Sequence, residues 1–289
     1  MHYEGIIIRP PSEADSILIQ ITTGCSHNKC TFCSTYKEKK FQIKRDSVIF
    51  EDIDFAAQYC KRQKRVFLCD GDALIIPIKR LVNIIKQIKK KLPWVTRIGL
   101  YANTKSLKMK TIEELKELKK LGVGILYMGL ETGDDVTLKK INKGADSQKM
   151  IDMGRKAKAA GFKLSITVLI GIAGKERSLI HAKETGRVLS AIEPDYVGAL
   201  SLMLIPDTLL YNEWENGNFT LINPSEMLLE LREMIANTNI SQGFFHANHA
   251  SNYLPIRARL PEEKEAVLKI LDDGIAGKVA LKPEKFRAL

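Results

Sequence analysis

The sequence lacks any long hydrophobic run. None of its apolar stretches approaches the roughly 20 residues that a membrane-spanning helix needs. The amino-terminal stretch MHYEGIIIRP has too short an apolar segment for a signal peptide. We therefore expect a cytoplasmic protein with no membrane partner.

Cysteine is scarce, with five residues in 289, and the odd number argues against a disulfide framework. In a reducing compartment, thiols that cluster along the chain indicate metal binding or catalysis. Cys25, Cys30 and Cys33 lie within nine residues of one another, whereas Cys60 and Cys69 stand apart. We interpret the latter two as core thiols, because free cysteine is among the most buried residue types.

Low-complexity tracts, linkers and internal repeats are also missing. Acidic residues are outnumbered, with 34 Asp and Glu against 45 Lys and Arg, for a net charge of +11. Lysines recur in runs at residues 37–45, 84–93 and 117–121, and solvated helix faces explain them. Attraction to an anionic substrate or to nucleic acid is the alternative explanation. Since no RNA-binding motif or aromatic-interleaved basic patch accompanies the charge, nucleic acid is not favoured as a partner.

Short apolar runs alternate with helical patterns. Strands are expected over residues 16–22, 65–70, 97–101, 123–131, 162–170 and 196–203. Helices are expected over residues 48–63, 77–92, 111–121, 134–141, 147–160, 176–192, 208–217, 224–238 and 261–275. Six strand–helix units in succession predict a parallel α/β sheet, and a full barrel needs about eight. We predict a partial (β/α)6 TIM-like barrel over residues 1–205 and a C-terminal helical extension over residues 206–289.

Polar or glycine-rich residues follow all six predicted strands. In parallel barrels the loops at the carboxyl ends of the strands form the active site. The residues in question are Cys25 to Cys33, Asp70-Gly71-Asp72, Asn103, Glu131, Gly171-Ile172-Ala173-Gly174 and Ile205-Pro206-Asp207.

The clustered thiolates could hold a metal. A structural zinc site usually has four ligands, but no second close cysteine pair exists, and His27 lies inside the loop itself. Iron–sulfur clusters normally take four thiolates. A loop with three thiolates leaves one iron open to a substrate or cofactor, so we expect chemistry at this loop.

Together these segments resemble the radical S-adenosylmethionine (radical SAM) superfamily over residues 16–212. The nearest branch includes anaerobic coproporphyrinogen oxidase, methylthiotransferases and anaerobic cyclase-like enzymes. The loop Cys25-x4-Cys30-x2-Cys33 has one residue more in its first gap than the commonest Cys-x3-Cys-x2-Cys spacing. The other matching segments are Asp70-Gly71-Asp72, Gly129 to Gly133, Leu138 to Gly144, Gly171 to Glu176 and Leu204 to Tyr211.

The resemblance implies an oxygen-sensitive enzyme with two cofactors, a 4Fe-4S cluster and S-adenosylmethionine. The implied metal ligands are Cys25, Cys30 and Cys33. The implied cofactor-binding residues are Phe32, Asp70, Gly71, Asp72, Asn103, Glu131, Lys143 and Thr167. A reducing partner such as flavodoxin or ferredoxin would supply the electron that cleaves S-adenosylmethionine. The resulting 5′-deoxyadenosyl radical would abstract hydrogen from an unknown substrate, and the positive charge leaves an anionic one open.

Within the resemblance, Asp70-Gly71-Asp72 stands where the family places residues that meet the amino group of S-adenosylmethionine. Glu131 is in the ribose-binding place, and Lys143 stands where relatives often have an arginine on the methionine carboxylate. Three of the assigned residues have structural alternatives. Glu131 could form a structural ion pair, Asn103 could be a turn residue, and Thr167 could be an ordinary strand residue.

Histidines and asparagines crowd into the segment 244–253, which we expect to be a loop between two helices. Histidine can exchange protons near neutral pH, so His249 is a candidate catalytic residue. The candidate substrate contacts are His246, Asn248 and Asn252. Ligation of a second metal is a further alternative, and so is a loop whose side chains cap helices.

Two competing functions remain at this point. One is an RNA-modifying enzyme of the same superfamily, and the other is a non-catalytic iron–sulfur or zinc-binding regulatory module. The sequence has no cysteine-rich tail for auxiliary clusters and no recognisable cobalamin-binding or methylthiotransferase domain. These absences argue against peptide maturation with auxiliary clusters and against methylthiolation.

Overall fold

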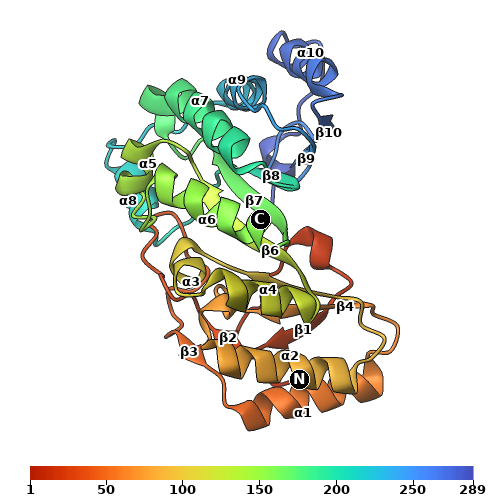
Figure 1. Cartoon of the computed structure of the whole chain (residues 1–289). Helices are drawn as coiled ribbons and strands as arrows, with labels where there is room; N and C mark the ends of the chain where they lie inside the picture. Colours follow the sequence, from red (N-terminus) through yellow and green to blue (C-terminus); the bar gives the residue numbers. More distant parts are fainter. Residues whose placement is uncertain (289) are drawn as a thin grey trace. The chain divides into compact units, whose positions relative to one another are not determined.

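The computed structural model describes residues 1–288, which form two compact units. The first unit contains residues 1–28, 35–128 and 156–164, and the second contains residues 29–34, 129–155 and the chain from residue 165 onward. Figure 1 labels the helices and strands. Strand β6 (Val123–Glu131), helix α6 (Ser147–Ala159) and strand β7 (Lys163–Ile170) contribute residues to both units.

The first unit contains parallel strands in the order β1-β4-β5-β6, namely β1 (Ile17–Gln20), β4 (Arg65–Cys69), β5 (Arg97–Tyr101) and the start of β6. A short antiparallel pair, β2 (Thr22–Thr23) and β3 (Gln42–Ile43), follows β1. The helices of this unit are α1 (Asp46–Tyr59), α2 (Ile78–Lys91), α3 (Thr104–Lys108) and α4 (Ile112–Lys120), with short 3-10 turns η1 (Pro11–Glu13) and η2 (Ala73–Ile75).

Near-continuous apolar strands build the core of the first unit. On β4, the side chains from Val66 to Cys69 are all fully buried, as expected for a parallel strand that is covered on both faces. Helix α2 contributes an apolar stripe at helical spacing, with Leu81, Ile84 and Ile88 buried. Its lysines, Lys79, Lys86, Lys89, Lys90 and Lys91, are exposed, so this basic run is a solvated helix face.

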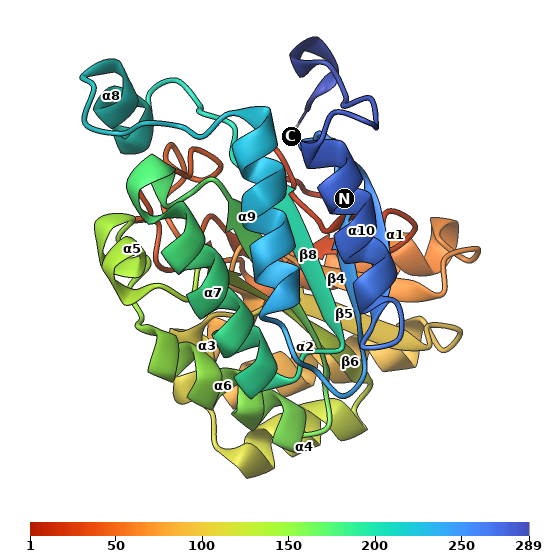
Figure 2. The same cartoon turned by 90° about the horizontal axis from the view of Figure 1, so that it is seen from above.

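The second unit contains strands in the order β7-β8-β9-β10, with β8 (Tyr196–Ser201) parallel to β7 and β9 (Gly243–Ala247) parallel to β8. The last strand, β10 (Ile256–Leu260), is antiparallel to β9. The helices are α5 (Asp135–Lys140), α7 (Gly174–Ile192), α8 (Leu209–Glu215), α9 (Pro224–Ala236) and α10 (Lys264–Ile275), with a terminal 3-10 turn η3 (Glu284–Phe286). Helix α9 packs between α7 and α10 (Figure 2).

The predicted fold class is confirmed. The chain is α/β with mostly parallel strands and intervening helices, and no closed barrel forms within residues 1–288. All six predicted strands are present, with ends that differ from the prediction by at most two residues. The division into a core over residues 1–205 and an extension over residues 206–289 stays a prediction.

The C-terminal region differs from the helical extension that we expected, because it also contains β9 and β10. Residues 243–247 form a strand where the prediction placed a loop between helices. The segment Ile256–Leu260 alternates apolar and charged residues, which is the pattern of a half-buried strand. Both strands are only five residues long, so each carries a short pattern that was not recognised in the sequence.

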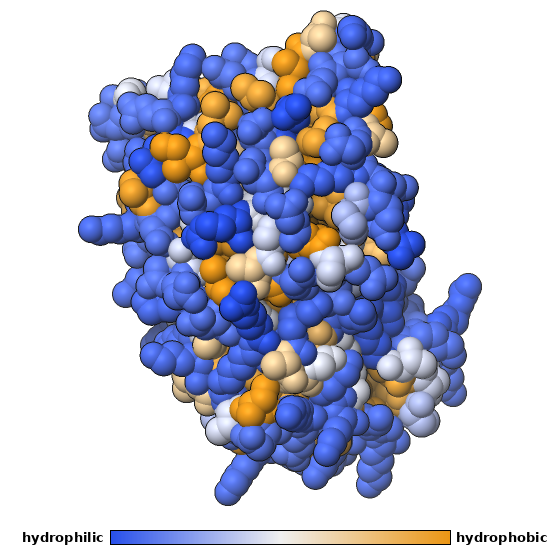
Figure 3. Space-filling model, turned by 45° about the horizontal axis from the view of Figure 1, so that its top comes forward, coloured by the Kyte–Doolittle hydropathy of each residue, from blue (hydrophilic) through white to orange (hydrophobic). Residues whose placement is uncertain are grey.

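Hydrophilic side chains dominate the face drawn in Figure 3, and hydrophobic ones are scattered over it in small groups. No helix among residues 1–288 is both long enough and apolar enough to cross a membrane.

Candidate functional site

In the first unit, polar side chains from three strand ends meet around Asp72. The Asp72 carboxylate accepts hydrogen bonds through Oδ2 from Asn103 Nδ2 at 2.8 Å and from Ser26 Oγ at 2.5 Å. Asn103 is also the N-cap of α3, where its side chain accepts from the Ser106 backbone N–H. The turn role that we considered for Asn103 is therefore present, and its amide additionally holds Asp72.

Asp70 is held by a second set of contacts. Its Oδ2 accepts from Gln20 Nε2 at 2.9 Å and from the Gly24 backbone N–H at 3.2 Å. Lys39 Nζ lies 3.7 Å from the same oxygen. Because Gly24 directly precedes Cys25, this carboxylate fixes the start of the cysteine loop.

Each of these two carboxylates keeps one oxygen without a partner. Asp70 Oδ1 and Asp72 Oδ1 are buried and accept no hydrogen bond within the described part of the chain. Burial raises the pKa of both groups, and their hydrogen bonds offset this only in part. A bound amine would satisfy these oxygens, so the pair fits the amino group of S-adenosylmethionine.

Gly71, between the two aspartates, packs directly against the start of the cysteine loop. A Cβ added at Gly71 would lie 2.9 Å from the Tyr36 ring and 3.2 Å from Cys25 Cβ. The Gly71 N–H donates to the Gly24 carbonyl at 3.2 Å. Any side chain at this position would therefore push the loop away from the aspartates.

In the second unit, the segment with the other two cysteines is anchored by its backbone and by Phe32. The Thr31 N–H donates to the Ile141 carbonyl, and the Thr31 carbonyl accepts from the Leu210 N–H, both at 3.0 Å. Phe32 packs against a buried apolar cluster formed by Ile141, Leu169, Ile172, Leu202, Leu210 and Phe219. These contacts leave the flanking Cys30 and Cys33 half-buried.

None of the five cysteines is in a disulfide, and Cys25, Cys30 and Cys33 are each half-buried. Half-buried thiols in an irregular loop suit a ligand set for an iron–sulfur cluster. Within residues 1–288, no three His, Cys, Asp or Glu side chains are gathered closely enough to hold a metal ion. The three-cysteine ligand set therefore stays a prediction based on the sequence motif.

Glu131, at the end of β6, forms an ion pair with Lys143, and their side-chain atoms Oε1 and Nζ lie 2.8 Å apart. A Cβ added at Gly129 would overlap Glu131 Oε1 and lie 3.0 Å from Lys143 Nζ. Gly129 thus makes room for the pair. The structural ion pair considered for Glu131 is present, and it joins two residues that we predict to bind the cofactor.

A buried polar network, which the sequence analysis missed, supports the turn after β7. Glu230 on α9 accepts from the Gly171 N–H at 2.6 Å and from Ser178 Oγ. His181 Nε2 lies 3.3 Å from Glu230 Oε1, and His181 Nδ1 lies 2.6 Å from Thr132 Oγ1. The network thereby links the glycine-containing turn after β7 to the residue that follows Glu131.

An ion pair supports the same region from α7. Arg177 donates two hydrogen bonds to the Asp134 carboxylate, each at 2.8 Å. Burial opposes ionisation of Asp134, but Arg177 and Thr137 together lower its pKa to about 2. Asp134 is also the N-cap of α5, so the pair fixes the start of the helix that precedes Lys143.

The remaining predicted residues lie along the β7–β10 strands and the loop after β9. Thr167 and His246 are half-buried strand residues, and Asn248 is exposed. Asn252 is buried, where its amide accepts from Ser201 Oγ and donates to the Ala199 carbonyl, both at 2.8 Å. These contacts anchor the loop to β8, and a substrate contact for Asn252 stays a prediction.

His249, the candidate catalytic residue, is half-buried in the loop after β9. Its Nδ1 lies 2.9 Å from Ser251 Oγ. Burial and the nearby Lys282 lower the pKa of its imidazole, so the ring is neutral at pH 7 and can accept a proton.

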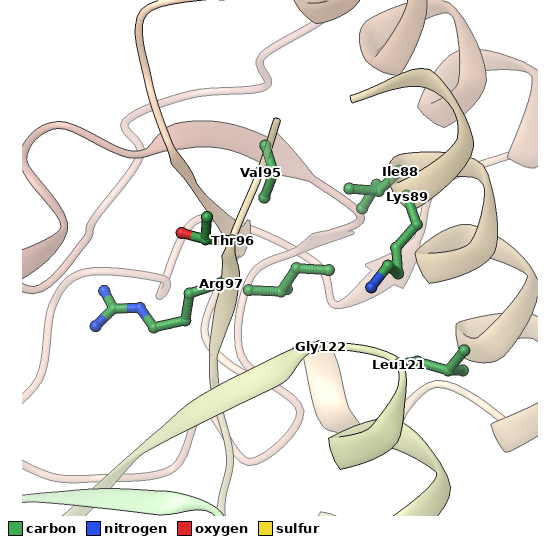
Figure 4. Close-up of a pocket in the computed structure, with 8 residues that line it drawn as sticks. Ile88, Lys89, Val95, Thr96, Arg97, Leu121 and Gly122 are labelled. Atoms are coloured by element: carbon green, nitrogen blue, oxygen red, sulfur yellow. The ribbon is translucent and has the colours of Figure 1, made fainter. Parts of the chain in front are cut away.

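Two hollows lie in the described part of the chain, and the larger of them is lined by Asn142 and Gly144, which flank Lys143 in the sequence. One, of about 10 Å³, stands at the amino-terminal end of β5 between Ile88, Val95 and Leu121 (Figure 4). It has room for about one water molecule and lies at the end of the strand opposite to its functional end. A second hollow, of about 370 Å³, is lined by both acidic and basic side chains, including Asp135 and Lys149, so charge favours no ligand class there.

Known proteins resemble this chain in sequence and in fold. It is 25% identical to the heme chaperone HemW of Bacillus subtilis over 177 residues, which are 61% of this chain and 45% of that protein. The chain thus spans less than half the length of that relative. The structure of methylornithine synthase (PylB) matches with a TM-score of 0.53 and 18% identity, covering 77% of this chain and 63% of that one. Coproporphyrinogen III oxidase (HemN) from Escherichia coli matches with a TM-score of 0.54 and 14% identity, covering 76% and 51%.

At these identities the solved structures show the fold alone, but a family model carries the assignment further. The model of the radical SAM superfamily matches residues 19–181, which is more than half of the chain. The family predicted from the sequence is therefore confirmed. The chain belongs to the radical SAM superfamily, whose cofactors are a 4Fe-4S cluster and S-adenosylmethionine.

Proposed function

We propose that Cys25, Cys30 and Cys33 hold the 4Fe-4S cluster, and that the enzyme abstracts hydrogen from a small organic substrate. When bound, the cluster and S-adenosylmethionine supply a 5′-deoxyadenosyl radical after reduction by one electron. A reducing partner such as flavodoxin or ferredoxin would provide that electron. None of the five cysteines is in a disulfide, which is consistent with work in a reducing compartment such as the cytoplasm.

The unpartnered oxygens of Asp70 and Asp72 carry this proposal. Two buried carboxylates with unfilled acceptor sites stand beside the residue that packs against Cys25. Burying an unpaired carboxylate oxygen is costly, so the arrangement favours a cationic ligand. The amino group of S-adenosylmethionine would supply both the hydrogen-bond donors and the compensating charge.

Other residues would orient the cofactor and keep water away. Glu131 has carboxylate oxygens that suit ribose hydroxyls, and Lys143 has the charge that suits a carboxylate. Phe32 extends an apolar cluster to the cysteine loop, which favours exclusion of water from a reactive site. The exposed lysines of α2 do not single out nucleic acid, and we propose neither RNA modification nor a purely regulatory metal site.

Anaerobic reconstitution with iron and sulfide tests the proposal. The reconstituted enzyme is mixed with S-adenosylmethionine and dithionite, and 5′-deoxyadenosine is quantified. Cys30→Ala should abolish product formation, whereas Cys60→Ala, a matched control outside the loop, should retain it. Binding of zinc in place of iron, or equal product from Cys30→Ala, would contradict the proposal.

A further inference from the structure

The strands β8, β9 and β10 of the second unit have one buried face and one open face. On β8, Val197 and Ala199 are buried, whereas Tyr196 and Gly198 are only half-buried. The same alternation holds on β9 and β10, because successive side chains point to opposite faces of a sheet. The open-face residues are Tyr196 and Gly198 on β8, Phe244 and His246 on β9, and Arg257 and Arg259 on β10. Leu200, on the same face of β8, packs instead against the apolar cluster that contains Leu169.

The strand register brings four of the residues on this side of the sheet into one line. Thr167 on β7 is paired with Gly198, and Gly198 is paired with His246. His246 is in turn opposite Arg257 on the antiparallel strand β10. Directly paired residues share a face, so Thr167, Gly198, His246 and Arg257 form a continuous row across four strands. We call these four residues the β7–β10 row.

Gly198 leaves open space in the middle of the row. A Cβ added at this position would meet no atom within 4 Å. Glycine weakens a strand interior, and one use of it there is to let a ligand approach the backbone. Any larger residue would occupy the space between Thr167 and His246.

Aromatic rings border this open space on one side. The Tyr196 and Phe244 rings are stacked, with centroids 6.0 Å apart and planes 15° apart. The Phe244 ring is also 5.9 Å from the His246 ring, and the Phe244 side chain is 42% exposed. An exposed phenylalanine beside an unfilled position offers a surface on which a flat ring can stack.

Arg257 adds an uncompensated positive charge at the end of the row. No carboxylate of the described chain lies within the 4 Å of an ion pair from its guanidinium, whereas Arg259 lies 3.6 Å from Glu262. Burial and the charge of Arg257 lower the pKa of His246, so this imidazole is neutral at pH 7. The row therefore offers a guanidinium fork beside an uncharged imidazole.

We propose that the β7–β10 row binds the substrate, and that this substrate is a planar anion, a conjugated ring bearing a carboxylate or phosphate. The ring would lie over Gly198 against Phe244, and the anionic group would meet Arg257 and His246. This inference rests on the proposed function, because it identifies the molecule that loses hydrogen.

A charged residue on an edge strand can also serve only to prevent pairing with another chain. β10 is the last strand in the order of its sheet, so that role is available to Arg257. It does not account for the empty position at Gly198 or for the exposed ring of Phe244. Charge complementarity together with the stacking surface favours the planar anion.

Two probes of the same shape test the inference by isothermal titration of the anaerobically reconstituted enzyme. One is 1-naphthoate, and the other is its neutral analogue 1-naphthamide. Wild type should bind the anion roughly tenfold more tightly or better, the size expected for a charge-assisted hydrogen bond. Arg257→Gln should remove this preference, and Gly198→Leu should weaken binding of both probes by filling the open space.

Two control variants accompany these measurements. Arg187→Gln removes the same charge from an exposed position on α7 and should leave the preference intact. Gly198→Ala, which the open space accommodates, should keep the melting temperature of wild type and so serves as the folding control. Equal affinity for the two probes in wild type, or an unchanged preference in Arg257→Gln, would overturn the inference.

The same preparations separate this inference from the proposed function. Formation of 5′-deoxyadenosine without a preference for 1-naphthoate refutes only the planar-anion site. The expected binding pattern without 5′-deoxyadenosine refutes the proposed reaction and leaves the anion site in place. Sedimentation tests a further outcome. If wild type self-associates and Arg257→Gln does not, the open face binds a second copy of the chain, which also overturns the inference.

Discussion

Lys143 Nζ lies 2.8 Å from Glu131 Oε1, so two residues predicted to bind different parts of S-adenosylmethionine are paired with each other. Their side chains are only 17% and 12% exposed, and a carboxylate buried this deeply needs a partner. Glu131 also has a positive φ of 63°, which is uncommon for a residue other than glycine. The pair therefore holds Glu131 in an unusual backbone conformation beside the predicted cofactor site.

Substitutions of the pair should be non-additive in cofactor binding. Glu131→Gln or Lys143→Met alone leaves the partner charge buried, and each should weaken S-adenosylmethionine binding by roughly tenfold or more. The double variant should lose less than the product of the two single losses, because it leaves neither charge unpaired. Equilibrium titration of the unreduced, reconstituted enzyme measures all three.

Lys143→Arg is the matched control for this cycle, since it keeps the charge and adds a guanidinium fork. We expect it to bind the cofactor within about threefold of wild type. The variant keeps the positive charge, and a change in the geometry of one hydrogen bond alters the binding free energy by only about 1 kcal/mol or less. Strictly additive losses in the cycle would mean that the pair does not couple the two residues during binding.

Gly129→Ala should impair cofactor binding and lower stability. The added methyl group would overlap the flexible end of Glu131 and displace it from Lys143. The free energy of unfolding should fall by about 1–3 kcal/mol, because the displacement separates two mostly buried charges. Gly124→Ala on the same strand provides the control, since the three atoms nearest to its methyl group would all belong to the side chain of Arg97. Equal cofactor affinities for the two variants would count against the displacement.

Asp72→Asn should stabilise the cofactor-free protein relative to wild type as the pH rises. Burial raises the pKa of Asp72 in the folded state above its unfolded value of about 3.9. The folded protein then binds the Asp72 proton more tightly than the unfolded chain does. The protonated carboxyl group contributes its full stability below about pH 4, and this contribution is lost as the pH rises through the pKa of the folded state. Urea unfolding at pH 4.5, 6.0 and 7.5 should show a growing advantage of the variant.

The exposed Asp152 on α6 supplies the control for this measurement. Asp152→Asn should change stability by a similar amount at all three pH values. Excess S-adenosylmethionine at pH 7.5 should stabilise reconstituted wild type more than Asp72→Asn, since the cofactor's amino group has lost one of its two charged partners. If the difference in the free energy of unfolding between wild type and Asp72→Asn did not change with pH, the charge of Asp72 would not be its cause.

The parts of the site that lie at the carboxyl ends of strands could be predicted from the sequence. A buried parallel strand is a local apolar run, and the residue that follows it is fixed by chain continuity. That logic located Asp72 and Glu131. It could not reveal that Ser26 and Asn103, 46 and 31 residues away from Asp72, share its carboxylate, because only the folded chain brings them together.

The buried pair of His181 and Glu230 was missed for a similar reason, although the sequence carries a signal for it. On α9 the buried residues Met227, Leu231 and Met234 form a stripe at helical spacing, and Glu230 lies inside that stripe. A single charged residue within an apolar stripe indicates a buried polar partner. The identity of that partner, on another helix 49 residues earlier, has no local signature.

Removing the carboxyl group of Glu230 should loosen the turn after β7 and weaken cofactor binding. Glu230→Leu leaves the Gly171 N–H and the Ser178 hydroxyl without acceptors in a buried place, which should cost roughly 2–3 kcal/mol. The melting temperature should fall by about 5–10 °C for a chain of this size.

Two further variants serve as controls. Glu230→Gln keeps an acceptor for Gly171, so its melting temperature should lie between those of wild type and Glu230→Leu. Glu265→Gln, an exposed change on α10, should have no effect. Thermal unfolding and cofactor titration measure both effects, and unchanged cofactor affinity in a folded Glu230→Leu variant would show that the network supports only the fold.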